Sequence, residues 1–467
     1  MRLPNMLDAA QRKAKANYIY EHRINQKIFG GKKYYIRTYG CQMNVHDTEE
    51  IKGLLESLGF NESENINISD LIILNTCAIR ENAHDKVFGF LGRLKHLKKN
   101  NPNLIIGLCG CMAQEESVVT YIKEKHSYID IVFGTHNICE LPKMLEEYTG
   151  KQKINVDSKE GNVIEFDNLY KRDSNITAWV NIMYGCDKFC TYCIVPYTRG
   201  KQRSRKLKDI LKEVIELKNA GYKEITLLGQ NVNAYGKDLE EKIEFSTLLE
   251  KVSKIGIERI RFVTSHPWDF TDEMIDVISK YDNIMPYIHL PVQSGSNKIL
   301  KLMNRKYTNE EYLTLFYKIK NKIKNVSITT DIIVGFPGEL EEDFEETLNL
   351  VKKCQFDGAF TFIFSARENT PASKMKDSLS LEEKNNRLQK LNKLINNYSK
   401  ESNLKTLGTI QKVLVTSISE RDNNKVAGYT ENMKLVNIDA PASSIGKIID
   451  VEIIDAKSFS LDGIMKI

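Results

Sequence analysis

Long apolar runs are missing from this 467-residue sequence. No stretch approaches the roughly 18 consecutive apolar residues that a membrane-spanning helix needs. The opening segment, MRLPNMLDAAQRKAKANYIYEHR, lacks the continuous apolar core of a signal peptide. The formal net charge is only +5, so bulk charge alone does not indicate a nucleic-acid-binding protein. We therefore expect a protein without a membrane anchor that works in the cytoplasm.

Solenoid repeats, low-complexity tracts and a G-x-G-x-x-G dinucleotide loop are also missing. A nicotinamide cofactor is therefore not indicated. What is present is ordinary for a globular chain: hydrophobic residues make up 41% and charged residues 28%. The length predicts two to four domains.

The first third of the chain predicts an α/β domain. Residues 1–33 are polar and basic and are interpreted as an extension. In residues 34–150, the strand-like segments YYIRTYGC, LIILNTC and LIIGLCGC alternate with segments of helical apolar spacing. This alternation predicts a doubly wound parallel sheet. The helix after the first strand is expected to be capped by Asp47 or Thr48, and residues 151–175 are interpreted as a linker.

The rest of the chain predicts two further domains. Residues 176–403 hold six strand candidates separated by helices, which indicates a full or partial β/α barrel with its chemistry at the carboxyl ends of the strands. Residues 404–467 hold five short, β-branched, turn-bounded segments, which predict a small closed all-β barrel. From Leu404 onward that barrel has eight basic and eight acidic residues, so its charge does not indicate RNA binding.

Three cysteines without a fourth follow the first strand candidate of the second series. Cys186, Cys190 and Cys193 are spaced C-x₃-C-x₂-C, and no other cysteine or histidine lies in that loop. Structural zinc sites bind four protein ligands, and a [4Fe–4S] cluster normally binds four thiolates. A cluster held by three would leave one iron open to a small molecule. The alternative is a zinc site completed by His266 or His289.

A second trio is spread over the N-terminal domain. Cys41, Cys77 and Cys111 lie 36 and 34 residues apart, and each follows a strand candidate. Ligands of open α/β sheets bind outside the carboxyl ends of the strands, so these residues predict a shared metal centre. Buried small hydrophobic residues are the alternative. We interpret the remaining cysteines as core residues, namely Cys109, Cys139 and Cys354.

Taken together, these motifs resemble the radical S-adenosylmethionine methylthiotransferases. The resemblance is carried by GCDKFCTYCIVPYTRG, TYGCQMNVHDTE, NTCAIRENAHDKV and GCMAQ, and it extends from residue 34 to residue 467. It implies two [4Fe–4S] clusters. Cys186, Cys190 and Cys193 would hold the cluster that binds S-adenosylmethionine, and Cys41, Cys77 and Cys111 the auxiliary cluster. It also implies that the C-terminal barrel is a TRAM domain.

The resemblance further implies an activity: methylthiolation of N6-isopentenyladenosine at tRNA position 37, beside the anticodon. It implies a flavodoxin- or ferredoxin-type electron donor and a monomer, and no catalytic residue beyond the cluster ligands. Two alternatives stay open. One is the same chemistry on N6-threonylcarbamoyladenosine or on a ribosomal-protein aspartate, and the other is a non-catalytic, metal-bearing RNA-binding protein.

Further residues are candidates for ligand binding, each with a purely structural alternative. Glycines at strand ends permit close approach of a ligand, so Gly229, Gln230, Gly335 and Gly338 are predicted to line the cofactor pocket. The basic segment RGKQRSRKLK predicts phosphate contacts, and RLKHLKK, at residues 93–99, a solvated helix face. In SARENTPAS, Glu368 and Asn369 stand where the resemblance leads us to expect Pro-Gly. The candidates for substrate binding are Arg199, Arg203, Arg205, Gln293 and Arg305.

Overall fold

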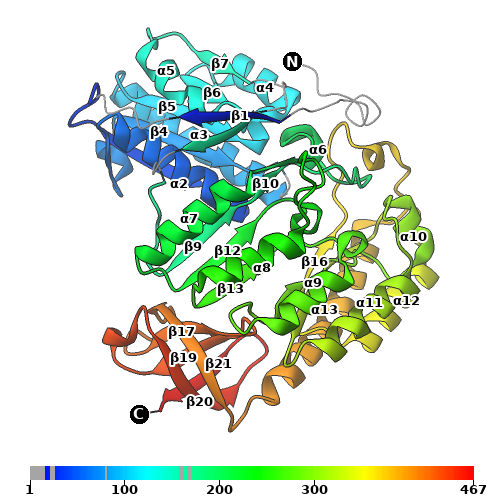
Figure 1. Cartoon of the computed structure of the whole chain (residues 1–467). Coiled ribbons are helices and arrows are strands. Elements are labelled where there is room, and N and C mark those ends of the chain that lie inside the picture. The colour runs from blue at the N-terminus through cyan, green and yellow to red at the C-terminus, as the bar shows by residue number, and fades with distance from the viewer. Residues whose placement is uncertain (1–15, 22–26, 79–80, 157–161, 167–169, 467) are drawn as a thin grey trace.

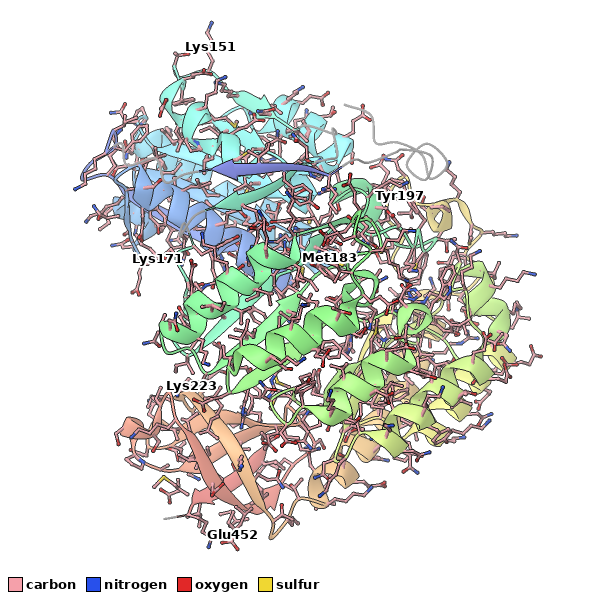
Figure 2. The ribbon with its side chains drawn as sticks, in the orientation of Figure 1. Lys151, Lys171, Met183, Tyr197, Lys223 and Glu452 are labelled. Carbon is pink, nitrogen blue, oxygen red and sulfur yellow. The ribbon has the colours of Figure 1, made fainter. Side chains whose placement is uncertain are left out.

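The structure is a computed structural model that describes residues 16–21, 27–78, 81–156, 162–166 and 170–466. Figure 1 shows an N-terminal α/β domain at one end, a central α/β domain, and a small β-barrel at the other end. Lys151 and Glu452 mark these two ends in Figure 2, while Met183 and Tyr197 lie between them. None of the described helices combines the length and apolarity that a membrane crossing needs.

The N-terminal domain is built on a six-stranded parallel sheet with the order β3-β2-β4-β5-β6-β7. Apolar residues of α2 and α5 pack on one face and those of α3 and α4 on the other, which confirms the doubly wound arrangement. The elements are β2 (Lys33–Thr38), α2 (Gln42–Ser57), β3 (Asn61–Glu62), β4 (Leu71–Thr76), α3 (Glu81–Asn100), β5 (Ile105–Gly110), α4 (Glu116–Lys125), β6 (Ile131–Phe133), α5 (Leu141–Glu146) and β7 (Lys153–Asn155).

The start of α2 differs from the prediction. The helix is capped by Cys41, whose backbone N–H donates to Oδ1 of Asn44, so the chain turns helical directly after β2. Asp47 and Thr48 therefore lie inside the helix and are buried. The prediction that they cap the helix was wrong, because the helix begins earlier, after Cys41, and cysteine is not among the residues preferred as N-caps.

The segments expected to be an extension and a linker both contain strands. β1 (Asn17–Glu21) pairs in parallel with β8 (Asn162–Phe166) as a two-stranded sheet. Tyr18 of β1 donates its hydroxyl to the carbonyl of Ser204 in the central domain, with an O···O distance of 2.9 Å. β7 also extends the N-terminal sheet beyond residue 150, so the boundary differs from the expected one by a few residues.

The central domain is an open β/α barrel made of two three-stranded parallel sheets, β13-β12-β9 and β14-β15-β16. A parallel bridge from Ile260 to Ile284 links them. Within the described residues β9 and β16 are edge strands, so the barrel is partial. The elements are β9 (Thr177–Asn181), α7 (Leu207–Asn219), β12 (Glu224–Leu228), α8 (Phe245–Ile255), β13 (Arg259–Phe262), α9 (Asp272–Lys280), β14 (Tyr287–His289), α10 (Asn297–Leu302), α11 (Asn309–Lys322), β15 (Ser327–Val334), α12 (Glu341–Cys354), β16 (Gly358–Ile363) and α13 (Leu381–Leu404).

The C-terminal domain is a closed five-stranded barrel with the order β17-β18-β19-β21-β20, as predicted. Arg259 and Arg261 of β13 attach it to the central domain. Their guanidinium groups donate to four barrel carbonyls at 2.8–2.9 Å. The barrel strands are β17 (Ile410–Ile418), β18 (Val426–Thr430), β19 (Leu435–Asp439), β20 (Ile448–Ala456) and β21 (Leu461–Met465).

Candidate active site

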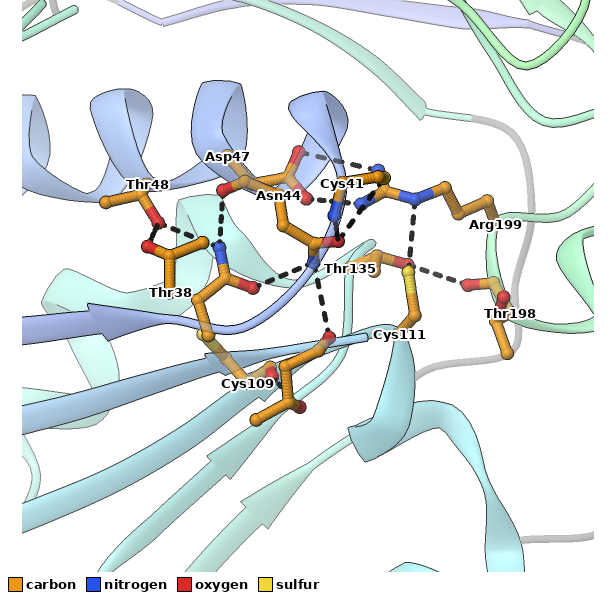
Figure 3. A network of polar contacts seen from close by, with 12 residues as sticks. Thr38, Cys41, Asn44, Asp47, Thr48, Cys109, Cys111, Thr135, Thr198 and Arg199 are labelled. Carbon is orange, nitrogen blue, oxygen red and sulfur yellow. Dashed lines mark hydrogen bonds and ion pairs between the residues drawn. The ribbon is translucent and has the colours of Figure 1, made fainter. Parts of the chain in front are cut away.

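The sulfurs of Cys41, Cys77 and Cys111 gather at the carboxyl edge of the N-terminal sheet. Figure 3 shows Cys41 at the start of α2 and Cys111 at the end of a neighbouring strand. Cys77 follows β4 and is fully buried. Its hydrogen bond to Cys41, together with the charge of Arg199, lowers the pKa of the Cys41 thiol to about 5. The edge therefore favours a thiolate at Cys41, the form that binds metals.

Two buried asparagines hold this edge in shape. The Nδ2 group of Asn44 donates to Oδ1 of Asn75 at 3.1 Å and to the carbonyl of Thr76 at 3.2 Å. The amide of Asn75 donates back to the carbonyl of Asn44 at 2.8 Å. Gly110 has φ 93°, and a Cβ there would lie 2.3 Å from the carbonyl oxygen of Thr76. The turn into Cys111 therefore requires glycine.

The second trio lies in the loop between β10 (Met183–Tyr184) and α6 (Val195–Thr198), and β11 (Arg203–Ser204) pairs back with β10. Cys186 N–H donates to the carbonyl of Gly200 at 3.1 Å, and Cys193 N–H donates to that of Cys190 at 2.9 Å. These bonds curl the loop so that its three cysteines interact with one another. Burial raises the pKa of Cys186 and raises that of Cys193 to about 12. These thiols are thus neutral without a cation, and a metal would ionise them.

The neighbouring elements hold this cysteine loop from several sides. Asn304 Nδ2 donates to the carbonyl of Phe189 at 3.0 Å, and Thr191 N–H donates to that of Met303 at 3.1 Å. The carboxamide oxygen of Gln230 accepts the N–H of Gly185. Phe189 is held at φ 47°, which is rare for an aromatic residue. Such strain persists only where the surroundings over-determine the backbone, so the loop is pre-shaped.

The two trios face a common contact between the domains. Ala78 and Cys111 from the N-terminal domain pack with Phe189, Ile194 and Tyr197 from the cysteine loop. Thr135 also donates to the carbonyl of Thr198 at 2.8 Å across the same junction (Figure 3). Residues adjacent to both cysteine sets are therefore in direct contact.

Arg199 links the domains at the same place. Figure 3 shows its guanidinium group between Asp47 and Cys111. It donates to Oδ2 of Asp47 at 2.5 Å and to Oδ1 at 3.4 Å, and its Nε donates to the Cys111 sulfur at 3.2 Å. All three side chains are buried. A cation from the central domain thus stabilises negative charge on a sulfur of the N-terminal domain.

The geometry argues against a single zinc ion in either trio. Four sulfurs at the 2.3 Å zinc–sulfur distance would lie about 3.8 Å apart. In the part of the chain that the structure describes, the only three His, Cys, Asp or Glu ligand atoms within 4.8 Å of one another are those of His46, Asp47 and Glu50. His266 packs on Tyr307, and His289 bonds to Thr329 and Asp331. Sulfurs spaced more widely suit a multi-iron cluster, which binds each thiolate to a different iron.

The arginines of the basic segment after the cysteine loop do not form an exposed surface. Arg199 is engaged as described, and Arg203 donates to the backbone carbonyls of Arg199 and Lys201. Arg205 pairs with Glu165 at 2.6 Å and with Glu213 at 2.7 Å. All three arginines are buried. Their charges are used inside the protein in this structure, and a contact of these arginines with tRNA stays a prediction.

Arg305 also lies against a cysteine rather than at the surface. Its Nη1 donates to the sulfur of Cys190 at 3.5 Å, and its Nη2 donates to the carbonyl of Pro291 at 2.9 Å. Gln293 is buried and has φ 73°, and its backbone bridges to Ile332 beside β15. Each cysteine trio therefore has one arginine that donates to a sulfur.

The residues predicted for the cofactor pocket lie after strands of the central domain, and Gln230 contacts the cysteine loop. Gly229 follows β12, and a Cβ there would lie 2.6 Å from Met183. Gly335 and Gly338 follow β15. Gln230 is the most informative of the four, because its Nε2 is buried without a hydrogen-bond partner among the described residues. A buried donor of this kind is costly unless a ligand satisfies it.

The inner face of the half-barrel carries residues that the sequence analysis passed over. Phe360 is 61% exposed and Phe362 47% exposed, although both lie on β16 in the middle of the fold. Their parallel partners on β15 are Asp331 and Ile333. His289 from β14 joins this face, with its ring 5.9 Å from that of Phe360 and its Nε2 3.3 Å from Asp331. The sheet face turned away from the helices is thus half aromatic and half polar.

Comparison with known proteins agrees with this architecture. The radical SAM superfamily matches residues 180–351, the uncharacterized protein family UPF0004 residues 33–134, and the TRAM domain residues 404–466. A tRNA-2-methylthio-N(6)-dimethylallyladenosine synthase of Staphylococcus epidermidis (ATCC 35984) is 56% identical over 98% of this chain and 91% of its own length. The chain belongs to this synthase family. A relative of the same name from Staphylococcus aureus MRSA252 is 55% identical over the same shares.

Solved structures share the fold of the family at much lower identity. The radical S-adenosylmethionine methyltransferase TsrM of Kitasatospora setae, solved with tryptophan and a SAM analogue, gives a TM-score of 0.54 at 12% identity. The match covers 73% of this chain and 75% of that chain. A second TsrM structure, with cobalamin and a [4Fe–4S] cluster, also gives 0.54, at 13% identity over 73% of this chain and 77% of that one. At this identity the comparison supports the fold only.

One loop departs from the pattern expected of the family. Glu368 and Asn369 are exposed, and Asn369 has φ 66°. Asparagine tolerates this left-handed conformation better than other residues with a side chain, so it can stand where the resemblance led us to expect glycine. Three residues later, Ala372 N–H donates to the carbonyl of Thr191 at 2.9 Å. This loop is therefore hydrogen-bonded to the cysteine loop.

Proposed function

We propose that this chain adds a methylthio group to N6-isopentenyladenosine at position 37 of tRNA, beside the anticodon, in the cytoplasm. The observation that carries the proposal is the meeting of two cysteine trios at one domain junction. The names of relatives at 56% and 55% identity support the same reaction. A non-catalytic RNA-binding protein would not need two sets of thiols around one contact.

The residues fit two iron–sulfur clusters. Membership of the radical SAM superfamily implies one [4Fe–4S] cluster and S-adenosylmethionine. Cys186, Cys190 and Cys193 would hold that cluster, and Cys41, Cys77 and Cys111 would hold the auxiliary one. When bound, these groups supply the electron that cleaves S-adenosylmethionine and the sulfur that is transferred.

The protein's own part is to position and shield the reactants. Arg199 and Arg305 each donate to one ligand sulfur, which fixes the orientation of that cysteine side chain. The Nε2 of Gln230, which has no hydrogen-bond partner among the described residues, would donate to S-adenosylmethionine. The strand-end glycines Gly229, Gly335 and Gly338 would let the same ligand approach the backbone closely. Phe189 and Tyr197 form an apolar wall beside both trios, which limits access of water.

The inner face of the half-barrel favours an isopentenyl substrate. The exposed rings of Phe360 and Phe362 would gain free energy by covering an apolar chain. A threonylcarbamoyl group carries a carboxylate, as does a protein aspartate, and either would face the carboxylate of Asp331. This is the observation that favours the prenylated nucleoside over the two alternative acceptors.

We further propose that one chain forms a complete site and works as a monomer, because both trios and the half-barrel belong to a single polypeptide. The reductant would be a flavodoxin- or ferredoxin-type protein. This part of the proposal follows from the electron requirement of the radical SAM superfamily.

Nucleoside mass spectrometry tests the activity. tRNA from cells lacking this protein should accumulate N6-isopentenyladenosine, and restoring the gene should convert it to the 2-methylthio derivative. The purified protein should hold about eight irons, as two four-iron clusters require. A methylthio product found only on N6-threonylcarbamoyladenosine or on ribosomal protein would refute the substrate. Zinc in place of iron would refute the reaction.

A further inference from the structure

A hollow on the N-terminal domain lies outside the cysteine junction. It has a volume of about 370 Å³ and opens between β2, the 3₁₀ turn η1 (Ile66–Ile68) and α3. Its lining includes Tyr35 and Arg37 of β2, Phe90 and Arg93 of α3, and Glu64 and Asn65 of the intervening loop. A volume of this size suits a single nucleotide or a ligand of similar bulk.

The hollow is organised by alternating rings and guanidinium groups. Arg37 lies 4.6 Å from the ring centroid of Phe90 and 5.1 Å from that of Tyr39. Arg93 lies 5.9 Å from the same Phe90 ring. Arg37 and Arg93 are exposed, and the three aromatic rings that surround them are partly exposed. Flat cations and rings in this order present both stacking faces and phosphate donors at one place.

The charge around the hollow is predominantly positive. Lys86 lies four residues before Phe90 on α3, so it shares the helix face that carries Phe90 and Arg93. Among the described residues that line the hollow, Glu64 is the one acidic residue. Arg93 begins the second basic segment of the sequence, RLKHLKK, which the proposed activity leaves unused. The hollow thus joins that segment to Arg37, a residue that no motif singled out.

The hollow also lies on the path toward the N-terminal cysteine trio. Arg37 is the last residue but one of β2, and Cys41 follows four residues later. Four residues span at most about 14 Å. Tyr39, which stacks on Arg37, lies between the two in sequence. An RNA whose target base reaches the cysteine junction would therefore pass neighbouring nucleotides close to this hollow.

We propose that the hollow binds one nucleotide of the RNA substrate outside the reacting base, with its base stacked against Phe90 or Arg37 and its phosphate on Arg37 and Arg93. Stacking on aromatic and guanidinium planes is how single-stranded RNA is held without strict sequence preference. The site takes a single-stranded nucleotide, because the faces of a base inside a duplex are covered by its stacked neighbours. This inference rests on the proposed RNA substrate and adds a second contact to it.

Binding of a fluorescein-labelled anticodon stem-loop RNA to the cluster-loaded protein tests the site by anisotropy. Arg37→Ala and Phe90→Ala should each weaken binding roughly 5- to 150-fold, the effect of losing one stacked base. Arg37→Lys keeps the charge and removes the planar group. It should keep the salt dependence of wild type but lose most of the affinity. Lys125→Ala, which removes an exposed charge from α4 of the same domain, should bind like wild type.

A second readout separates loss of folding and loss of the proposed activity from loss of this site. Each variant should cleave S-adenosylmethionine without RNA at the wild-type rate and melt at the wild-type temperature. Wild-type affinity in Arg37→Ala and Phe90→Ala would overturn the site even if tRNA is methylthiolated. Weakened RNA binding together with no methylthiolation by wild type would overturn the proposed function and leave the site standing. Slower reduction by a flavodoxin with unchanged RNA affinity would show that an acidic protein uses this hollow instead.

Discussion

The buried pair of Asp47 and Arg199 should be among the costliest contacts to break in this protein. The side chains of Arg199 and Asp47 are 5% and 3% exposed, and the shortest N···O distance is 2.5 Å. At an effective dielectric constant of about 20, opposite charges this close attract by about 7 kcal/mol. Desolvation of both groups offsets much of that attraction. Removing Asp47 restores none of the desolvation cost of Arg199, whose guanidinium group stays buried and, among the described residues, keeps the Cys111 sulfur as its one remaining acceptor.

The expected loss for Asp47→Ala is therefore about 3–5 kcal/mol, as for other buried pairs that lose one partner. For a cooperatively unfolding domain of about 150–250 residues, this loss corresponds to a fall in Tm of roughly 6–20 °C. The measurement is thermal unfolding of the metal-free, reduced protein, so that cluster loss does not contribute. Asp272→Ala is the matched control. It removes one carboxylate from the exposed pair with Lys318, with side chains 65% and 49% exposed, and should change stability by at most about 1 kcal/mol.

The double variant Asp47→Leu/Arg199→Met, measured together with the single variants Asp47→Leu and Arg199→Met, forms a double-mutant cycle. Since the second substitution removes the charge that the first left unpaired, the double variant should be more stable than Asp47→Leu alone. Additive losses in the cycle, or a Tm of Asp47→Ala equal to that of the Asp272→Ala control, would refute the reasoning. Either result would mean that water reaches the guanidinium group at this junction.

Three further outcomes follow from the site. Cys190→Ala should abolish S-adenosylmethionine cleavage, while Cys77→Ala should spare cleavage and stop methylthiolation, as liquid chromatography of 5′-deoxyadenosine and of nucleosides would reveal. Burial, and then the charge of Asp47, raises the pKa of Glu50 to about 8 from 4.5, so folding favours its protonated form. The contribution of Glu50 to the free energy of unfolding is therefore largest below pH 4.5. It falls by up to about 1.4 kcal/mol per pH unit as the pH rises to about 8. Glu50→Gln should flatten that part of a urea-denaturation pH series. Replacing Phe360 and Phe362 by Ala should raise KM for isopentenylated RNA about tenfold. An equal effect on RNA lacking the prenyl group would contradict the assignment.

The cysteine trios could be predicted because the relevant signal is local. Each of Cys41, Cys77 and Cys111 directly follows a strand, and parallel strands bring their carboxyl ends to one edge. The loop of Cys186 to Cys193 is local in a stricter sense, since the whole set lies within eight residues. The C-terminal barrel was likewise readable from its short turn-bounded segments. In these cases position along the chain fixes position in space.

The role of the arginines could not be read in the same way. A basic segment such as RGKQRSRKLK usually lies at the surface, and nothing within it reveals a partner. The carboxylates that pair with Arg199 and Arg205 belong to Asp47, 152 residues away, and to Glu165, 40 residues away. Phe360 and Phe362 were passed over for the opposite reason: an apolar strand predicts burial, and only the open edge of the half-barrel leaves these rings exposed.

The junction between the N-terminal and central domains is held largely by charge, and this has a functional consequence. Besides Asp47 and Arg199, Arg172 pairs with Glu49 of α2 at 3.3 Å and with Glu213 of α7 at 2.5 Å. Buried ion pairs add little net stability compared with apolar packing, but they are favourable only when the distance and orientation of the two groups are well defined. An apolar interface would tolerate sliding by an ångström or more, whereas a guanidinium group that must meet both a carboxylate and a cysteine sulfur does not. Because Arg199 makes both contacts at once, the placement of the two domains and the environment of the Cys111 sulfur are set by the same side chain. The proposed reaction, in which sulfur passes from one cysteine trio to a substrate activated at the other, needs that placement to be reproducible, and a polar junction supplies it where a larger apolar one would not.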